Sequence, residues 1–170
     1  EGQVMITSVA LNFITREKPV FTFIYYGLPA VTGSEKGFSS AEYYHSVSEI
    51  DAEIAKLTAG LQEAKMLQNT TIIVTSDVGK TNTGSLSQST SDIEVPWIIS
   101  GPTVQKNIVI DATNDLMNTS PVIARILGLK TPPEWIGRTV AEAFTAKNPK
   151  TKANVYVPKP ICSLAGGAYP

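Results

Sequence analysis

The residues most able to do chemistry lie where an apolar run ends in an acidic side chain, in the stretch IIVTSDVGKTNTGS at residues 72–85. Two kinds of site are compatible with Asp77 followed by Gly79-Lys80-Thr81: a carboxylate that binds a metal ion, or a loop that binds a phosphate. A phosphate-binding loop needs a glycine five residues before Gly79 and a helix directly after the threonine. Val74 occupies the first position, and turn-forming residues follow the second. The sequence therefore argues against a nucleotide-binding P-loop.

Asp77 remains a candidate because of its position at the end of a predicted strand. In open parallel sheets, ligands bind outside the carboxyl ends of the strands. The structural alternative is an aspartate that bonds the backbone of its own turn. No histidine, cysteine or paired carboxylate accompanies Asp77 in the adjacent loops, residues 27–40 and 78–92. The sole histidine, His45, lies on a predicted helix, and we interpret it as a partly exposed helix residue.

Hydrophobic periodicity predicts alternating helices and strands around these loops. A first helix has a loose apolar face of Val4, Met5, Val9 and Phe13. A second helix begins at Ser40 as N-cap and carries an apolar stripe at Val47, Ile50, Ile54, Leu57, Leu61 and Ala64. The predicted helices cover residues 3–16, 40–67 and 118–128, and the predicted strands cover residues 20–26, 70–77, 95–101 and 107–111. This order predicts an α/β protein with a mostly parallel sheet, in which the first two strands are parallel.

The last predicted helix has clear signals at both ends. Asn118 or Thr119 is expected to cap it, Pro121 lies in its first turn, and Gly128 ends it. These signals are local, so they do not depend on the rest of the fold.

Composition excludes several classes of function. The chain has 170 residues, 42% of them hydrophobic, and a formal net charge of −1. Such a charge does not attract nucleic acid or an anionic membrane. No apolar run approaches the ~18 residues of a membrane span. Cys162 is the only cysteine, so no disulfide can form within the chain.

Four segments, taken in order, resemble a known family. They are KPVFTFIYYGLPAVTGSEKGFSSAEYYHSVSEIDAEIAKLTAGL, NTTIIVTSDVGKTNTGS, DIEVPWIISGP and NTSPVIARILGLKTPPEWIGRTVAEAF. Their order and spacing resemble the alkaline phosphatase superfamily, especially bacterial type I phosphodiesterase/nucleotide pyrophosphatase proteins and their sulfatase relatives. The likeness implies the carboxyl-terminal half of a three-layer fold, with helices on both faces of a mostly parallel sheet. Residues 1–146 would form that half. Residues 147–170 would form a linker or the start of an appended domain.

The resemblance also implies a site. Enzymes of this family hold two divalent ions, typically zinc, beside a threonine or serine nucleophile that lies in the amino-terminal half. In the carboxyl-terminal half, ligands would be expected where this sequence has Ala30, Ser34, Asp77, Val78 and Ser85. Only Asp77 matches. We therefore expect no catalytic residue and no bound cofactor in this chain, because a catalytic zinc ion needs about three protein ligands.

Three hypotheses follow from that comparison. The chain is an inactive fragment of a metal-dependent phosphodiester or phosphomonoester hydrolase, or part of an active enzyme whose ligand residues were substituted or misassigned, or a non-catalytic binding or scaffold domain. A flavodoxin-like nucleotide binder is disfavoured, because no phosphate loop follows an early strand. The beginning and end of the sequence lead us to expect a fragment. We expect contact with a missing amino-terminal half or self-association through an exposed sheet edge, and the resemblance implies a periplasmic or extracellular location.

Overall fold

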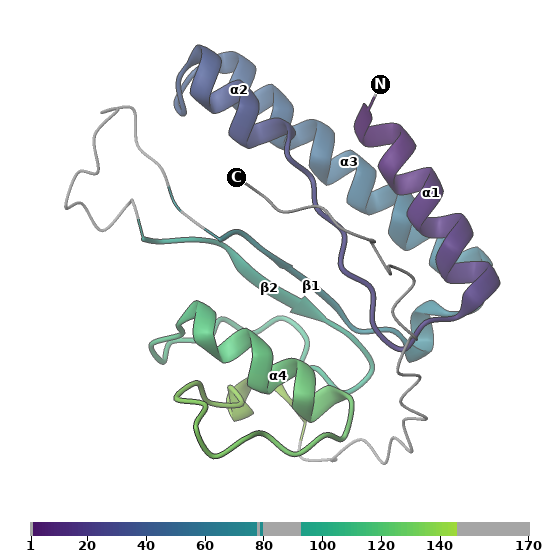
Figure 1. Ribbon diagram of the computed structural model, residues 1–170, viewed down its shortest axis with the longest axis vertical. Helices are drawn as coiled ribbons and strands as arrows, with labels where there is room; N and C mark the ends of the chain where they lie inside the picture. The colour runs from purple at the N-terminus through teal and green to yellow at the C-terminus, as the bar shows by residue number, and fades with distance from the viewer. Residues whose placement is uncertain (1, 78, 80–92, 146–170) are drawn as a thin grey trace, which may run out of the picture.

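The computed structural model describes residues 2–77, 79 and 93–145. Its helices are α1 (Gly2–Glu17), α2 (Leu28–Lys36), α3 (Ala41–Glu63) and α4 (Thr119–Ile126), with short 3-10 helices η1 (Leu67–Asn69), η3 (Leu116–Asn118) and η4 (Ala141–Ala143). The strands are β1 (Ile72–Thr75) and β2 (Trp97–Ser100). Figure 1 shows α1, α2 and α3 gathered on one side, the two strands in the middle, and α4 on the other side. No helix of the described ranges is both long and apolar enough to cross a bilayer.

Helix α3 confirms the predicted N-cap. The backbone N–H of Tyr43 donates to the Ser40 hydroxyl at 3.1 Å, which satisfies one of the free amides in the first turn. The helix ends at Glu63 rather than at the predicted residue 67, and the chain continues into η1. Both α1 and α2 pack against α3.

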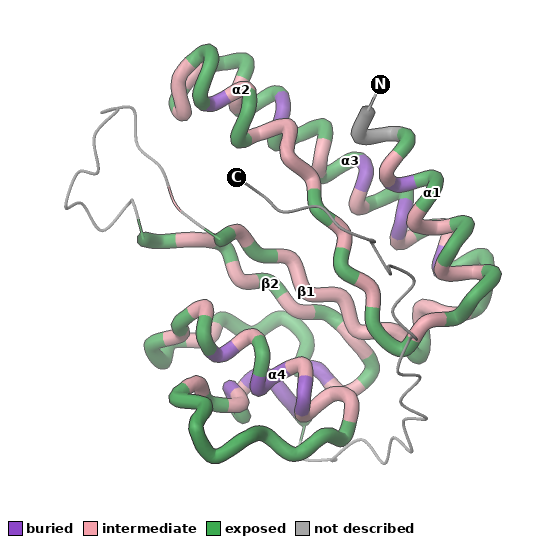
Figure 2. Tube along the Cα trace, viewed as in Figure 1, coloured by how far each residue is buried: buried purple, intermediate pink, exposed green. Residues whose placement is uncertain are grey.

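The apolar faces predicted for these helices are partly wrong. Met5, Val9 and Phe13 of α1 are 65%, 63% and 45% exposed, so the predicted face is not the one packed on α3. Figure 2 shows α1 as a mixture of exposed and less exposed residues. The opposite side of α1 carries the buried Thr7, and Leu11 approaches α3 closely at Gly60. A β-carbon at Gly60 would lie 2.2 Å from Leu11 Cδ2, so the glycine allows the two helices to approach.

On α3 the buried line also differs from the predicted stripe. Its members are Ser46, Glu53, Leu57 and Leu61. Of the predicted stripe, Val47 and Ala64 are exposed. Leu57 and Leu61 belong to both lines, whereas Ser46 and Glu53 are buried in place of Val47 and Ile54, so the buried line is shifted by one residue at its amino-terminal end.

Helix α2 lies within residues 27–40, where we predicted a loop, so that prediction was wrong. Pro29 sits in the first turn, where its missing N–H costs no hydrogen bond. Gly37 ends the helix with φ of 99°, a conformation that favours glycine. Both residues were interpreted as loop signals, but they mark the two ends of a short helix.

The sheet of the described residues consists of β1 and β2 alone, and the pair is antiparallel. Its register places Ile73 opposite Ile99 and Thr75 opposite Trp97. Residues 20–26 run extended but join no ladder, and residues 107–111 form no strand either. Strand propensity alone is insufficient, because an extended segment counts as a strand only when a neighbour pairs with its backbone. The predicted parallel pairing of residues 20–26 with the strand at 72–75 is therefore not formed here, and the three-layer arrangement implied by the resemblance stays a prediction.

The main core lies between the sheet and α4. Its buried members are Val104, Val122, Val140, Ala143 and Phe144. Ile73, Trp97 and Ile99 pack onto it from one face of the sheet. The indole Nε1 of Trp97 donates to the Thr119 hydroxyl at 3.0 Å, which joins β2 to the first turn of α4.

Two of the three end signals predicted for α4 are confirmed. Pro121 lies in the first turn and is buried, and Gly128 follows the helix with φ of 68°. Its N–H donates to the Arg125 carbonyl at 3.1 Å. Asn118 occupies the predicted N-cap position, but its side chain makes no capping hydrogen bond and bonds elsewhere.

Candidate functional site

Two of the five candidate ligand positions lie on α2. Ala30 and Ser34 are separated by four residues, so they share one face of the helix, and both are exposed. Alanine offers no donor atom to a metal ion, and a neutral hydroxyl is a weak ligand compared with histidine or a carboxylate. This face of α2 therefore has the spacing of a ligand pair without its chemistry.

Asp77 follows β1 and is exposed. Figure 1 places the end of β1 and α2 on the same side of the molecule. Val78 and Ser85, the remaining two candidate positions, lie outside the described residues, as does Lys80 of the rejected phosphate loop. Among the candidate positions that the structure describes, Asp77 is therefore the one whose side chain is a good metal ligand.

The metal pair that the sequence resemblance implied does not fit the donors among the described residues. Within the described ranges, no group of three histidine, cysteine, aspartate or glutamate side chains is arranged to hold a metal ion. Ala30, Ser34 and Asp77 together offer one carboxylate and one hydroxyl. Since a catalytic zinc ion takes about three histidine or carboxylate ligands, we derive no chemical step through a metal in this chain.

A shallow hollow lies between α2 and the start of α3, with a volume of about 460 Å³. Its lining residues are Leu28, Thr32, Ala41, Glu42, His45, Ser46 and Glu49. His45 Nε2 lies 3.2 Å from Glu49 Oε1, and the histidine side chain is 76% exposed. This confirms the interpretation of His45 as a solvent-facing helix residue, and its neighbour Glu49 is one turn away on the same helix.

A buried polar cluster connects α1, α3 and the extended segment, and sequence reasoning missed it. Glu53 carries a carboxyl group, yet it lies on the buried line of α3 and is only 4% exposed. Lys56 Nζ lies 2.5 Å from Glu53 Oε1, and the Thr7 hydroxyl lies 2.9 Å from the Tyr26 hydroxyl. The pKa of Glu53 is lowered, most by a hydrogen bond from Lys56 and next by one from Thr7. The cluster positions helices rather than reacting groups.

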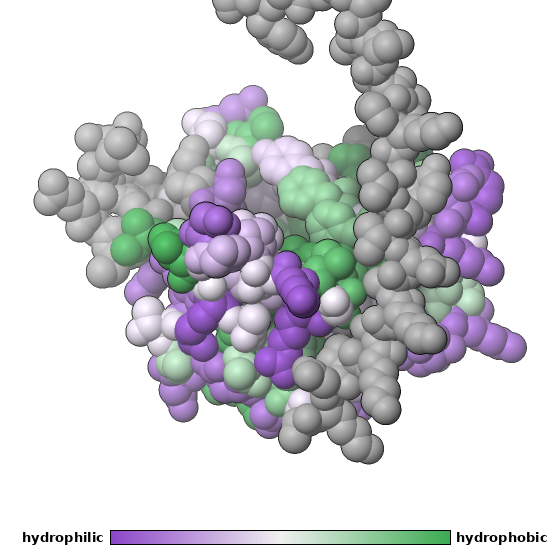
Figure 3. Space-filling view, turned by 60° about the horizontal axis from the view of Figure 1, so that its bottom comes forward, coloured by the Kyte–Doolittle hydropathy of each residue, from purple (hydrophilic) through white to green (hydrophobic). Residues whose placement is uncertain are grey.

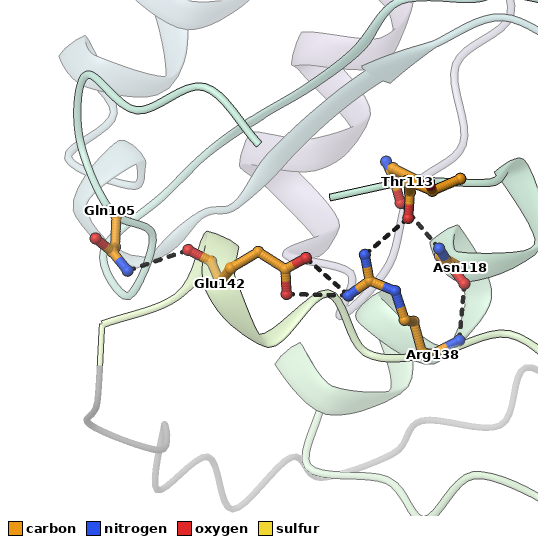
Figure 4. Close-up of polar contacts among 6 residues, drawn as sticks. Gln105, Thr113, Asn118, Arg138 and Glu142 are labelled. Atoms are coloured by element: carbon orange, nitrogen blue, oxygen red, sulfur yellow. Dashed lines mark hydrogen bonds and ion pairs between the residues drawn. The ribbon is translucent and has the colours of Figure 1, made fainter. Parts of the chain in front are cut away.

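A second polar network holds the carboxyl-terminal segment of the described chain in place (Figure 4). The backbone N–H of Arg138 donates to Asn118 Oδ1 at 2.7 Å, and its guanidinium donates to the Thr113 carbonyl at 2.9 Å and to Glu142 at 3.0 Å. The Asn118 amide also donates to Asn114 at 3.0 Å, which explains why it does not cap α4.

Glu142 is part of that network. The pKa of the Glu142 carboxyl is lowered, most by a hydrogen bond from its own backbone N–H and next by one from the Arg138 side chain. The Gln105 amide donates to the Glu142 carbonyl at 3.1 Å, so the loop after β2 is tied to η4. No sequence signal connects residues so far apart, and the structure alone brings them together.

Comparison with known proteins identifies the family of this chain. A family model described as type I phosphodiesterase / nucleotide pyrophosphatase matches residues 3–96, which include α1, α2, α3, β1 and the candidate ligand positions. The chain belongs to this family. The family lies within the alkaline phosphatase superfamily, so the fold class is the α/β class of that superfamily.

Curated relatives are sulfatases. The chain is 28% identical over 102 residues to arylsulfatase K of Mus musculus, covering 57% of the chain and 18% of that protein. It is 26% identical over 125 residues to arylsulfatase K of Bos taurus, covering 69% of the chain and 23% of that protein. This phosphodiesterase-family chain therefore spans about a fifth of the length of these relatives. No solved structure matches it.

Proposed function

We propose that this chain is one part of a phosphodiester or phosphomonoester hydrolase-like protein of the sulfatase-related branch, and that it has no hydrolase activity as it stands. A single observation supports the proposal. The family model matches residues 3–96, but the candidate metal-ligand positions within that range carry only one side chain that binds a metal ion well. In this proposal Asp77 is the only metal ligand at the five candidate positions, because the others carry Ala30, Ser34, Val78 and Ser85.

The physical reason for inactivity is coordination. Two divalent cations held close together repel each other, so a site needs several negative or strongly donating ligands to bind both. Asp77 supplies one negative charge and is exposed to water. The nucleophile and the remaining ligands of the family belong, in this proposal, to a part of the protein outside these residues. The same part would complete the three-layer, mostly parallel sheet.

A second candidate is a non-catalytic domain that binds or scaffolds, and the observation that favours it is a core around α4 that is built from residues outside the candidate ligand positions. Direct contacts among side chains hold the buried residues around α4, and hydrogen bonds hold the Arg138 network. A third candidate is an active phosphodiesterase whose ligand residues were substituted or misassigned. Export from the cytoplasm is proposed by analogy with the family alone.

The test is hydrolysis of bis-p-nitrophenyl phosphate and p-nitrophenyl sulfate by the purified chain in excess zinc. We expect release of p-nitrophenol at the rate of the protein-free zinc solution. Turnover above that rate, abolished by Asp77→Asn, would contradict the proposal and favour an active site. The matched control is Asp111→Asn, which removes a carboxylate from a loop that matches no ligand position.

If the coding sequence has aspartate at position 30 and histidine at positions 34, 78 and 85, the third candidate replaces the first. A quadruple variant tests the third candidate directly. Its substitutions are Ala30→Asp, Ser34→His, Val78→His and Ser85→His. In our proposal it gains zinc affinity but still lacks a nucleophile, so it binds zinc without hydrolysing either substrate.

A further inference from the structure

Two Asn-x-Ser/Thr tripeptides occur in the sequence, and the proposed function uses neither. They are Asn69-Thr70-Thr71 and Asn118-Thr119-Ser120. In an exported protein, such a sequon accepts an N-linked glycan on its asparagine when the middle residue is not proline. Because so short a pattern is common by chance, the surroundings of each asparagine decide whether the folded chain can carry the glycan.

Asn69 lies at the surface. It is the last residue of η1, in the turn that joins the end of α3 to the start of β1 (Figure 1). The residue is exposed, and its side-chain amide makes no hydrogen bond to the described part of the chain. Only its backbone N–H is used, which donates to the Met66 carbonyl at 2.9 Å. A glycan on the Asn69 side chain would therefore break no hydrogen bond and extend into water.

The neighbours of Asn69 in the chain also suit a glycan. Four of them are polar and exposed: Gln62, Glu63, Lys65 and Gln68. Elsewhere the surface is more apolar, and Figure 3 shows hydrophobic side chains gathered in the middle of one face. An apolar patch is a surface on which another part of a protein packs, whereas a glycan must stay in water. The turn at Asn69 has the character of an outer surface.

Asn118 has the opposite surroundings. It is only 5% exposed, and both polar atoms of its side chain are bonded. Its Oδ1 accepts from the Arg138 N–H at 2.7 Å, and its Nδ2 donates to Asn114 Oδ1 at 3.0 Å. A sugar on Nδ2 would need the space that these partners fill. A chain with a glycan at Asn118 would therefore not reach the described fold.

The third residue of the first sequon indicates when the sugar is attached. Thr70 is extended, with φ of −112° and ψ of 131°. Thr71, whose hydroxyl completes the sequon, is half-buried, and a β-carbon at Gly101 would lie 2.5 Å from its Oγ1. Gly101 directly follows β2, so the Thr71 hydroxyl is covered once β2 has paired with β1. We therefore expect transfer to the nascent chain, before the two strands pair.

We propose that Asn69 is the N-glycosylation site of this chain and that Asn118 is unmodified in the folded protein. The donor is an oligosaccharide carried on a lipid pyrophosphate. The Asn69 side-chain nitrogen forms a bond to the anomeric carbon of the first sugar and gives up one proton. The bond from that carbon to the pyrophosphate oxygen breaks, and the lipid pyrophosphate leaves with the bonding electrons. The inference rests on export, which belongs to the proposed function, and not on the lack of hydrolase activity.

The test is expression of the chain behind a cleavable secretion leader in cultured eukaryotic cells. The leader supplies export, so a negative result concerns the site and not the natural location of the protein. Chain from the medium and from the cell lysate is treated with peptide N-glycosidase in heavy-oxygen water, which converts each glycosylated asparagine into a labelled aspartate. Mass spectrometry of the peptides then gives the occupancy at positions 69 and 118. Hydrolase assays on the same preparations test the proposed function separately.

We expect one glycan per secreted chain, at position 69. Asn69→Gln and Thr71→Ala should remove it, whereas Thr71→Ser should keep it, because a hydroxyl still completes the sequon. The matched control is Ser120→Ala, which destroys the second sequon at an exposed residue and keeps the bonds of Asn118, so the glycan pattern of the secreted chain should not change. Asn69→Gln should unfold at the same urea concentration as the unmodified chain, because its side chain has no hydrogen bond to lose among the described residues.

Two results would overturn the proposal. The first is an unoccupied position 69 in chain from both the medium and the lysate, which would mean that the turn is not a glycan acceptor. The second is a glycan at position 118 in secreted chain that unfolds at the same urea concentration as the Ser120→Ala variant, because the bonds of Asn118 would then tolerate a sugar. A glycan at position 118 that is confined to the lysate would agree with the proposal, since such molecules fail to fold.

Discussion

The contact between Arg125 and Phe144 gives the sharpest test of how the main core is built. The Arg125 Cζ atom lies 4.5 Å from the centroid of the Phe144 ring, within the range of a cation–π interaction. Phe144 is 4% exposed and belongs to the buried cluster, whereas Arg125 is partly buried at the end of α4. The contact joins α4 to the last described residues of the chain.

The perturbation is a double-mutant cycle of Arg125→Met and Phe144→Leu. Both replacements keep a side chain of similar length or volume, so the cycle isolates the ring–cation term from packing. Cation–π pairs contribute about 0.5–1 kcal/mol when exposed and about 2 kcal/mol when desolvated. Because the ring is buried and the cation is half-buried, we expect a coupling energy of about 1–2 kcal/mol. Phe144→Leu alone should cost about 1–3 kcal/mol, the sum of that term and imperfect packing.

The assay is urea unfolding followed by tryptophan fluorescence, because Trp97 packs on the same core. A matched cycle combines Phe144→Leu with Arg16→Met, which removes an exposed arginine of α1. The control cycle should be additive within about 0.3–0.5 kcal/mol, the usual limit for distant sites. If the Arg125 cycle were additive within the same limit, the ring and the guanidinium would not interact, and the cation–π contact described between α4 and the carboxyl-terminal segment would be wrong.

Three further predictions concern the other connections in the fold. Ser40→Ala should lower the free energy of unfolding by about 0.5–2 kcal/mol through loss of the α3 cap, whereas Ser40→Asp should retain it; equal urea midpoints for the two variants would contradict the cap. Gly137→Ala would place a β-carbon 2.2 Å from the Met117 carbonyl oxygen, a backbone atom, and should cost about 1–3 kcal/mol in urea unfolding. Gly27→Ala, where the nearest atom is a side-chain carbon at 3.2 Å, serves as its control and should be close to neutral. The folded-state pKa of Glu53 is lowered from its ordinary value of 4.5, so its stabilising contribution is present above pH 4.5 and is lost as pH falls through the folded pKa. Glu53→Gln should therefore be less stable than the unmodified chain at pH 7, with the difference narrowing below about pH 4.5 in thermal unfolding; a difference independent of pH would contradict the ionised cluster.

The features predicted correctly from the sequence are those with local causes. A serine that accepts from the N–H three residues later, or a proline at the start of a helix and a glycine after it, acts within one turn. Ser40 and the Pro121–Gly128 pair therefore marked α3 and α4 near their true ends. The family resemblance was also readable, because the order and spacing of several segments carry it together.

Features that depend on distant partners were not predictable in the same way. Residues 20–26 have the composition of a strand, but no described strand pairs with them. Glu53 interrupts the apolar line of α3 because Thr7 and Lys56 surround it, and neither partner is visible from the periodicity of α3 itself. The Arg138 network joins three loops far apart in the chain. At the candidate site, the sequence indicated which positions lack ligand chemistry, but only the structure places two of them on a helix, α2, where a loop was expected.

The measurement that tests the central claim most directly is the zinc content of the folded chain. After equilibrium dialysis against micromolar zinc, elemental analysis should find well under one tightly bound ion per chain, and Asp77→Asn should leave the value unchanged. Two ions per chain, lost in Asp77→Asn, would show that these residues assemble a metal pair after all and would contradict the account.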